Sequence, residues 1–434
     1  MKMKYVLTMI LVFAALMSAE QKGMAEVISR NPLLTPTVIE EYTQTEDEFT
    51  NILLLGIDYG GDIFTGSGNK RKLEDCHTDG VIVVSLNRTK NELNLVSVPR
   101  DSLTYVPGIR GIYKLNAAIN CGESIEQGCE LACDAVSWHL GGIKIDKYVA
   151  VDATALAALG DAIGGIQNFK VDTGFQGKHR WYEAGQTYDL DGVEMMYYMR
   201  VRQRATVDYT DIGRTKRQRR MLSAVFNKIK SNPALLLNVM KAYQSGEINV
   251  FTNIDLMDLM TLATTTLSLD LEGVNSHVLT GEYKTFMKNF TFNDQAHRQE
   301  VIKTVYGVDV PQKQHVSYAY TRWLTEAGLT TAKYINMARD VIAHCKTKDN
   351  LTQAQQDAFA ALDAATDACI LAFDQAADTM ASDDTKAMVD ARNAMKPTVE
   401  KAARLFRYPT PIKWGRNEYW YREQMINEVS LNWN

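Results

Sequence analysis

Two aspartates adjoin neighbouring apolar segments of the sequence, and their carboxylates could hold a cation. Asp58 closes the apolar run 51–58, and Asp79 precedes the apolar run 80–86 after a Gly-rich polar loop. Antiparallel pairing would bring the end of the first strand beside the start of the second. Two carboxylates in that position repel each other unless a cation neutralises them, and Mg²⁺ accepts one or two carboxylates plus substrate phosphates. The spacing alone is equally compatible with two acids that cap turns.

A basic cluster further along the chain could bind an anion. Arg214 and Gln218 stand at positions i and i+4, so they share one face of a helix. Arg200 and Arg202 would point about 200° apart in a helix, so both reach one ligand only at an irregular helix end. Because arginine forks match phosphate oxygens, convergence of these groups predicts an oxyanion clamp, whereas a solvated helix face is the plain alternative. The whole cluster comprises Arg200, Arg202, Arg204, Arg214, Lys216, Arg217, Arg219 and Arg220.

A third polar group follows the apolar segment 92–98. Arg100 and Asp101 come directly after this segment, and Lys114 and Asn116 follow a Pro-Gly loop. Arginine, lysine and aspartate beside an acidic pair are side chains that metal-assisted phosphoryl transfer uses, although ordinary loop charges remain the alternative. The sequence has no GxxxxGK(S/T) phosphate loop, no GxSxG element and no HExxH motif. It therefore does not belong to the P-loop enzymes.

The elements that must position these groups alternate between strands and helices. Such alternation is typical of an α/β layered domain, which we place at residues 48–310. The predicted strands lie at 51–58, 80–86, 92–98, 145–151 and 166–171, and the predicted helices at 121–140, 153–163, 192–202 and 213–230.

Residues 311–434 differ from this domain and are predicted to form a helical region. The stretch 318–406 is Ala-rich and has no convincing strand, and helix-start signals occur at 350–355 and 382–383. Apolar residues recur there at alternating steps of three and four, which predicts one seam of a helix in a bundle of about three helices. Such a seam is more often plain core than a binding groove. Its members are Phe359, Leu362, Thr366, Cys369, Phe373, Ala376 and Met380.

The composition bounds the class of protein. The chain has 434 residues, 46% of them hydrophobic and 23% charged, which argues against global disorder and predicts two or three domains. A formal net charge of -5 gives no general reason to expect nucleic acid as a partner. The total does not exclude a smaller anion, because it averages acidic stretches with the basic cluster.

The N-terminus predicts export. Residues 1–25 begin with two lysines, at positions 2 and 4, which are followed by a short apolar run and small residues. This is the pattern of a signal peptide that is cleaved after Ala19 or Ala25, or of a retained membrane anchor. A polar linker at 26–47 follows. An exported chain with six cysteines is expected to contain disulfides, with pairings among Cys76, Cys121, Cys129 and Cys133. If the turn between their helices lies at 346–350, Cys369 is about 28 Å along its helix from that turn, at about 1.5 Å per residue, whereas Cys345 is beside it. A disulfide needs Cα atoms within about 7 Å, so either the turn lies elsewhere or Cys345 and Cys369 are not partners.

The motifs in their order resemble the LytR-CpsA-Psr family of extracytoplasmic wall-assembly enzymes. Each motif is weak alone, but eight in one order over residues 51–218 make the resemblance specific to the α/β domain, and it does not extend to the helical region. They are Asn-Ile-Leu-Leu-Leu-Gly-Ile-Asp at 51–58, His-Thr-Asp-Gly at 77–80, Ser-Val-Pro-Arg-Asp-Ser at 97–102, Lys-Leu-Asn-Ala-Ala at 114–118, Gly-Gly-Ile at 164–166, Leu-Asp-Gly at 190–192, Tyr-Met-Arg-Val-Arg at 198–202, and Asp-Ile-Gly-Arg at 211–214 with Arg217-Gln218.

The resemblance implies an α/β/α fold with a central mixed sheet and a Mg²⁺-assisted transfer at a membrane surface. The glycan would move from a polyprenyl-pyrophosphate carrier to a peptidoglycan hydroxyl. By motif position, Asp58 and Asp79 would hold Mg²⁺, and Asp101 and Asp211 would orient arginines or accept the hydroxyl proton. The pyrophosphate would be bound by Arg100, Lys114, Arg200, Arg202, Arg214 and Gln218. The sequence lacks the arginine that the family usually has just after the first aspartate, and Arg204 is a candidate substitute for a missing partner.

Two other functions stay open. A hydrolase would use the same site with water in place of the acceptor. A non-enzymatic wall-binding scaffold would act through the helical region.

Overall fold

The computed structural model describes residues 48–58, 73, 76–109, 112–145, 147–201, 211–245, 250–255, 258, 274–286, 288–313, 316–410 and 412. The segments predicted as signal or anchor, 1–25, and as linker, 26–47, lie outside these ranges. The described chain divides into two compact units, one that ends at Thr325 and one that begins at Glu326. Within the described ranges, no helix is both long and apolar enough to cross a bilayer.

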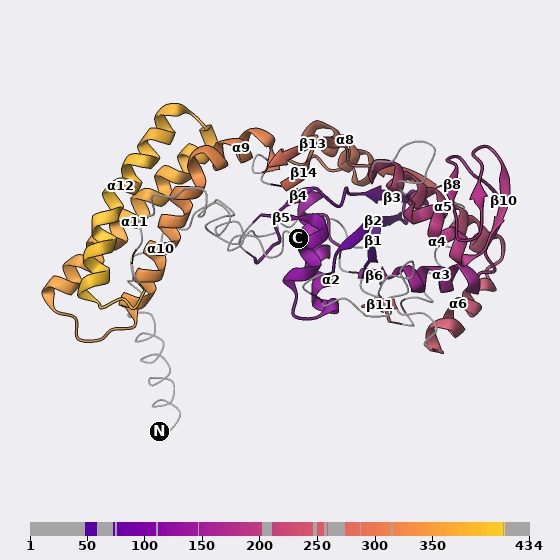
Figure 1. Cartoon of the computed structure of the whole chain (residues 1–434), viewed down its shortest axis with the longest axis horizontal. Coiled ribbons are helices and arrows are strands. Elements are labelled where there is room, and N and C mark those ends of the chain that lie inside the picture. Colours follow the sequence, from indigo (N-terminus) through magenta and orange to yellow (C-terminus); the bar gives the residue numbers. More distant parts are fainter. Residues whose placement is uncertain are drawn as a thin grey trace, which may run out of the picture. The chain divides into compact units, whose positions relative to one another are not determined.

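The first unit is built on a mixed sheet whose strand order is β11-β6-β1-β2-β3-β12 (Figure 1). β1 pairs antiparallel with β2 and parallel with β6, while β3 pairs antiparallel with β2 and parallel with β12. The edge strand β11 is antiparallel to β6. The strands span Phe49–Ile57 (β1), Thr78–Asn87 (β2), Glu92–Ser97 (β3), Lys147–Val151 (β6), Val250–Thr252 (β11) and Val274–Val278 (β12).

Helices cover both faces of this sheet. Alternating residues of β2 enter two different apolar clusters, because successive side chains of a strand point to opposite faces. Val81 and Val83 pack with α2 (Ile125–His139) and α8 (Gln295–Tyr306). Val84 and Leu86 pack on the other side with Phe226 of α5, which spans Asp211–Ser231. The three-layer α/β/α arrangement with a mixed central sheet is therefore confirmed.

A smaller lobe carries the strand predicted at 166–171, which lies outside the central sheet. We call it the α3–α4 lobe, and its aromatic core includes Phe169, Phe175, Tyr182 and Tyr198. The two-stranded sheet of β7 and β10 and the hairpin of β8 and β9 are both antiparallel. The elements are α3 (Ala153–Ala162), β7 (Ile166–Lys170), β8 (Phe175–Gln176), β9 (Trp181–Tyr182), β10 (Thr187–Leu190), α4 (Gly192–Arg200) and α6 (Leu235–Gln244).

The helix predicted at 121–140 begins later than expected. A short helical segment, η2, ends at Cys121, and α2 begins only at Ile125. The reason is local: the hydroxyl of Ser124 accepts a hydrogen bond from the backbone N–H of Gln127 and so caps the helix. The remaining elements of this unit are β4 (Leu103–Thr104), β5 (Tyr113–Lys114), η2 (Leu115–Cys121), β13 (Gly281–Phe286), β14 (Lys288–Asn293) and α9 (Tyr318–Trp323).

The second unit is a bundle of three long helices, α10 (Leu329–Lys346), α11 (Gln353–Thr379) and α12 (Ser382–Leu405) (Figure 1). The predicted seam of α11 is buried at its centre, from Leu362 to Ala376, and partly buried at its ends. Thr352 and Gln355 form a capping box at the start of α11, as the helix-start signal predicted.

All six cysteines are described, and all are free thiols, so the expected disulfides are not formed in this structure. The thiols of Cys121 and Cys133 contact the backbone carbonyls of Ala117 and Lys147 at 3.9 and 4.0 Å. Five of the six side chains are buried. Each thiol is thus packed as a small apolar group beside its own local partners.

Candidate active site

The two predicted metal carboxylates adjoin the same β1–β2 pair, as expected for antiparallel neighbours. Ile57 of β1 is paired with Thr78 of β2, so Asp58 and Asp79 lie at the same end of this central strand pair. The Asp58 carboxylate accepts a hydrogen bond from the backbone N–H of His77 at 2.5 Å. This hydrogen bond joins Asp58 to the segment that leads into β2.

Asp79 is contacted by two arginines that come from different elements. Arg100, in the turn after β3, forms an ion pair with the Asp79 carboxylate. Arg214, in the first turn of α5, places Nη1 at 3.7 Å from Asp79 Oδ1 and donates from Nη2 to the Asp79 carbonyl at 2.8 Å. The Arg214 side chain is only 4% exposed, so this interaction is shielded from water. Two guanidinium groups distant in sequence thus converge at one point.

Asp101 extends this contact to a second cation. Its carboxylate lies 2.8 Å from Lys114 Nζ and 3.7 Å from Arg100 Nε. Lys114, at the end of β5, also lies over the ring of Phe290 at 5.9 Å from the centroid. Arg100 therefore links two aspartates.

The resulting charge network alternates in sign: Lys114, Asp101, Arg100, Asp79, Arg214. Three cations face two anions, so the network carries one excess positive charge. The basic side chains already have carboxylate partners, and a more highly charged anion could exchange for those partners. Such an arrangement can bind phosphate oxygens.

Two neutral groups lie beside this network. Gln218 is adjacent to Gly80, where an added Cβ would sit 3.4 Å from the Gln218 Oε1 atom. Asn116 is 6% exposed, and among the described residues its Oδ1 atom accepts no hydrogen bond. The sequence placed both in motifs, and the geometry gives Gln218 the predicted face of α5, shared with Arg214.

Arg217 was not among the predicted site residues. It is almost completely buried, and its Nη2 atom donates to the carbonyl of Val201 at 2.5 Å. Val201 caps the end of α4, so Arg217 ties α5 to the point where the chain leaves α4. A helical arginine three residues after Arg214, on the same side, was the available sequence signal.

The remaining predicted groups are placed only in part. α4 ends at Arg200, whose side chain is half-buried, two residues before the predicted end. Arg202 and Arg204 lie outside the described residues. Asp211 begins α5, but its side chain is outside the described part. The predicted clamp is thus brought together at Arg100, Lys114, Arg214 and Gln218.

Cys76 lies two residues before β2, and its side chain is buried in the apolar core of the α/β unit. Burial raises the pKa of the Cys76 thiol, and the neighbouring Asp58 carboxylate raises it further. The thiol is therefore neutral at ordinary pH and unsuited to act as a nucleophile.

A model of the LytR_cpsA_psr family matches residues 15–321. The polyisoprenyl-teichoic acid–peptidoglycan teichoic acid transferase TagU of Enterococcus faecalis is 32% identical over 196 residues, which cover 45% of this chain and 56% of that protein. The probable cell wall biosynthesis protein LcpB of Corynebacterium glutamicum is 31% identical over 195 residues, which cover 44% of this chain and 42% of that protein. The chain thus spans about half the length of these curated relatives. The crystal structure of B. subtilis TagV matches 61% of this chain and 98% of its own, at 25% identity and a TM-score of 0.48.

Proposed function

The chain belongs to the LytR-CpsA-Psr family, and from this premise we propose that it transfers a glycopolymer from a polyprenyl-pyrophosphate carrier to peptidoglycan. Similarity to proteins named as teichoic acid–peptidoglycan transferases supports the reaction class. Support from the molecule itself comes from the charge network around Asp79.

The convergence of Arg100 and Arg214 on Asp79 is the observation that carries this proposal. A pyrophosphate bears several negative charges, which repel an attacking hydroxyl. Guanidinium groups that bind its oxygens reduce this repulsion and stabilise charge in the transition state. The excess of positive charge in the network favours the exchange of aspartate for phosphate.

The reaction requires one bond to form and one to break. The acceptor hydroxyl oxygen forms a bond to the phosphorus that bears the glycan, and the bond from this phosphorus to the bridging oxygen breaks. The bridging oxygen keeps the electron pair and leaves as polyprenyl phosphate. Asp101, which contacts Lys114 and Arg100, orients these two cations. Asp211 is the candidate acceptor of the hydroxyl proton.

Asp58 and Asp79 are the residues that would hold a Mg²⁺ ion. In the described part of the chain, no group of three acidic, histidine or cysteine side chains could hold a metal ion. A site made by two carboxylates and completed by substrate phosphates is one that Mg²⁺ commonly accepts. A bound ion would neutralise part of the pyrophosphate charge.

The carrier lipid sets the place of action. A polyprenyl chain stays in the bilayer, so the enzyme would work on the extracytoplasmic surface of the cell membrane, next to the wall. The basic and apolar character of residues 1–25 supports this location.

Transfer from a lipid-linked glycopolymer to peptidoglycan tests the proposal. Arg100→Ala and Arg214→Ala should each lower the rate by about 10²- to 10³-fold, the usual effect of removing one donor to a developing charge. Lys216→Ala is the matched control, because Lys216 lies on α5 near Arg214 but is exposed. Full activity in both arginine variants would contradict the proposal.

The same assay separates the alternatives. Release of free phosphoglycan without an acceptor would identify a hydrolase. Glycan binding without any turnover would identify a wall-binding scaffold.

A further inference from the structure

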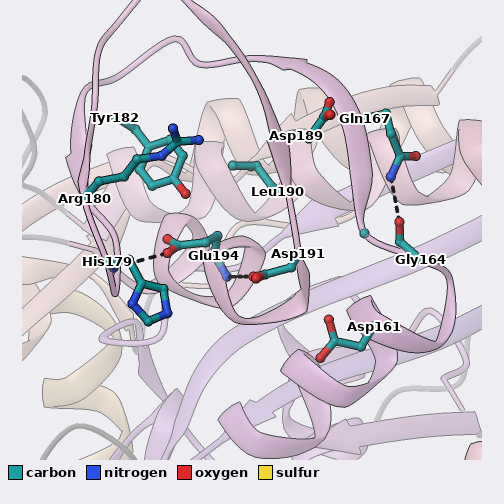
Figure 2. A pocket seen from close by; sticks show the side chains of 11 residues that line it. Asp161, Gly164, Gln167, His179, Arg180, Tyr182, Asp189, Leu190, Asp191 and Glu194 are labelled. Carbon is teal, nitrogen blue, oxygen red and sulfur yellow. Dashed lines mark hydrogen bonds between the residues drawn. The ribbon is translucent and has the colours of Figure 1, made fainter.

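A pocket of about 440 Å³ opens in the α3–α4 lobe (Figure 2). It lies between the end of α3, the β7–β10 sheet, the β8–β9 hairpin and the start of α4. The charged groups of its lining are Asp161, Asp189, Asp191, Glu194, His179 and Arg180. None of them belongs to the charge network around Asp79.

Three carboxylates of this lining are held by backbone N–H groups. Asp161 accepts from the N–H of Gly192, Asp191 from that of Glu194 and Asp189 from that of Asn168, each at 2.8 Å. One oxygen of each carboxylate is fixed in this way, and its second oxygen can accept hydrogen bonds from a ligand. The positions of these negative charges are therefore set before any ligand binds.

The positive charge of the pocket is held on aromatic rings. Arg180 stacks over Tyr182 at 4.8 Å and over Tyr188 at 5.0 Å from the ring centroids. Tyr182 in turn stacks on Phe175 at 4.7 Å with an interplanar angle of 7°. The guanidinium is exposed and hydrogen-bonds the Tyr182 side chain, and its other N–H groups can bind an anionic group.

Opposite charges come from different walls of the pocket. Figure 2 shows Arg180 and His179 on the hairpin side and Asp161 on the side of α3, with Asp191 and Glu194 between them. A metal ion does not suit this arrangement, because no three ligating side chains converge in the described residues. A ligand that carries an ammonium group and a carboxylate matches both walls.

We propose that this pocket binds the peptide portion of the peptidoglycan acceptor. The ammonium group lies on the acidic side of the pocket, which carries Asp161, Asp189 and Asp191, and the carboxylate lies against Arg180. This inference rests on the proposed function, because peptidoglycan is the acceptor there. It adds a subsite that fixes the peptide while the sugar hydroxyl reacts elsewhere.

The length of α4 relates this pocket to the basic end of the same helix. Asp191 caps the start of α4, and Arg200 ends it. At about 1.5 Å per residue, these ends lie about 14 Å apart. An extended peptide of five residues reaches about 17 Å. A peptide anchored at Asp191 can therefore leave its sugar near the arginine end of α4.

Calorimetric titration of the full chain with a soluble disaccharide-pentapeptide fragment of peptidoglycan, which carries a free side-chain ammonium, tests the subsite. Arg180→Gln and Asp189→Asn should each weaken binding by about tenfold, the effect of one lost charge-assisted contact. Asp189→Asn keeps the Oδ1 acceptor for the Asn168 N–H, so the fold is preserved. Lys178→Gln and Glu183→Gln are matched controls, because both residues are exposed near the hairpin and outside the pocket lining.

Two modified probes sharpen this test. An N-acetylated fragment, and a disaccharide without peptide, should bind at least about tenfold more weakly than the intact fragment. Equal binding of either probe, or unchanged binding by both pocket variants, would overturn the inference.

The transfer assay distinguishes failure of the subsite from failure of the proposed function. Transfer by wild-type protein with no effect of Arg180→Gln or Asp189→Asn on the acceptor KM rejects the subsite alone. Peptide binding that depends on Arg180 in a protein without transfer activity rejects the proposed function and supports the pocket.

Discussion

The α/β unit and the helical unit bury different kinds of side chain. In the α/β unit, arginine, histidine and aspartate are at least nine-tenths buried, among them Arg214, Arg217, Arg298, His139 and Asp101. In the helical unit, the most buried side chains are mainly apolar, as at Leu362, Phe373, Met388 and Val399, and Asp374 is the charged residue buried to that extent among the described residues. Burial of charge is costly unless the charges are paired, and Arg214 and Asp101 are both paired within the charge network around Asp79. The comparison places the charge network of the candidate site in the α/β unit.

Removal of divalent metal is expected to have the largest effect and would sharpen this comparison. Dialysis against EDTA should reduce transfer by at least about 10²-fold, because the carboxylates near the pyrophosphate would lose their neutralising ion. Titration with Mg²⁺ should restore the rate. Unchanged transfer after complete metal removal would contradict the proposal that Asp58 and Asp79 hold Mg²⁺.

Truncation of the bundle core should affect stability and leave chemistry intact. Phe373→Ala should lower the free energy of unfolding of the helical unit by about 3–5 kcal/mol, because it removes a fully buried ring from the seam of α11. Leu371→Ala is the matched control, since this side chain is 59% exposed on the same helix. Thermal unfolding and transfer rate are measured on both variants. A loss of transfer in a folded Phe373→Ala protein would break the comparison.

Acid should weaken the α/β unit through His139. Burial, together with the nearby positive charges of Arg298 and Lys313, lowers the pKa of His139 from 6.5 to about 3. The unfolded chain therefore takes up the proton first as pH falls. The contribution of His139 is complete above pH 6.5 and decreases by about 1 kcal/mol between pH 6.5 and 5.5.

Denaturant unfolding at several pH values checks this expectation. His139→Gln should reduce the slope of unfolding free energy against pH in that window, whatever its effect on total stability. An identical slope in wild type and variant would show that His139 does not contribute to the pH dependence of stability.

Sequence patterns predicted the local elements well. The apolar runs of β1, β2 and β3 identified three central strands. Antiparallel pairing of β1 with β2 brought Asp58 and Asp79 to one end of this strand pair, as expected. The seam of α11 followed from local periodicity alone. Each of these features depends on short-range rules of strand and helix geometry.

The contacts that join distant segments were not predictable in the same way. β12 reads Val-Asn-Ser-His-Val, a polar pattern that gives no strand signal, and it joins the sheet by pairing with β3. The contact of Arg214 with Asp79 requires the position of α5 relative to β2, which no local pattern specifies. The pocket beside Arg180 is formed by turns and a hairpin whose approach to α3 depends on the packing of the lobe.

The central claim is that Arg100 and Arg214 form part of a pyrophosphate site. Calorimetric titration of the full chain with a soluble short-chain prenyl pyrophosphate tests it most directly. We predict that Arg214→Ala weakens binding by at least about tenfold, as expected for one charge-assisted contact, while Lys216→Ala leaves it unchanged. Equal affinity of wild type and Arg214→Ala would contradict the claim.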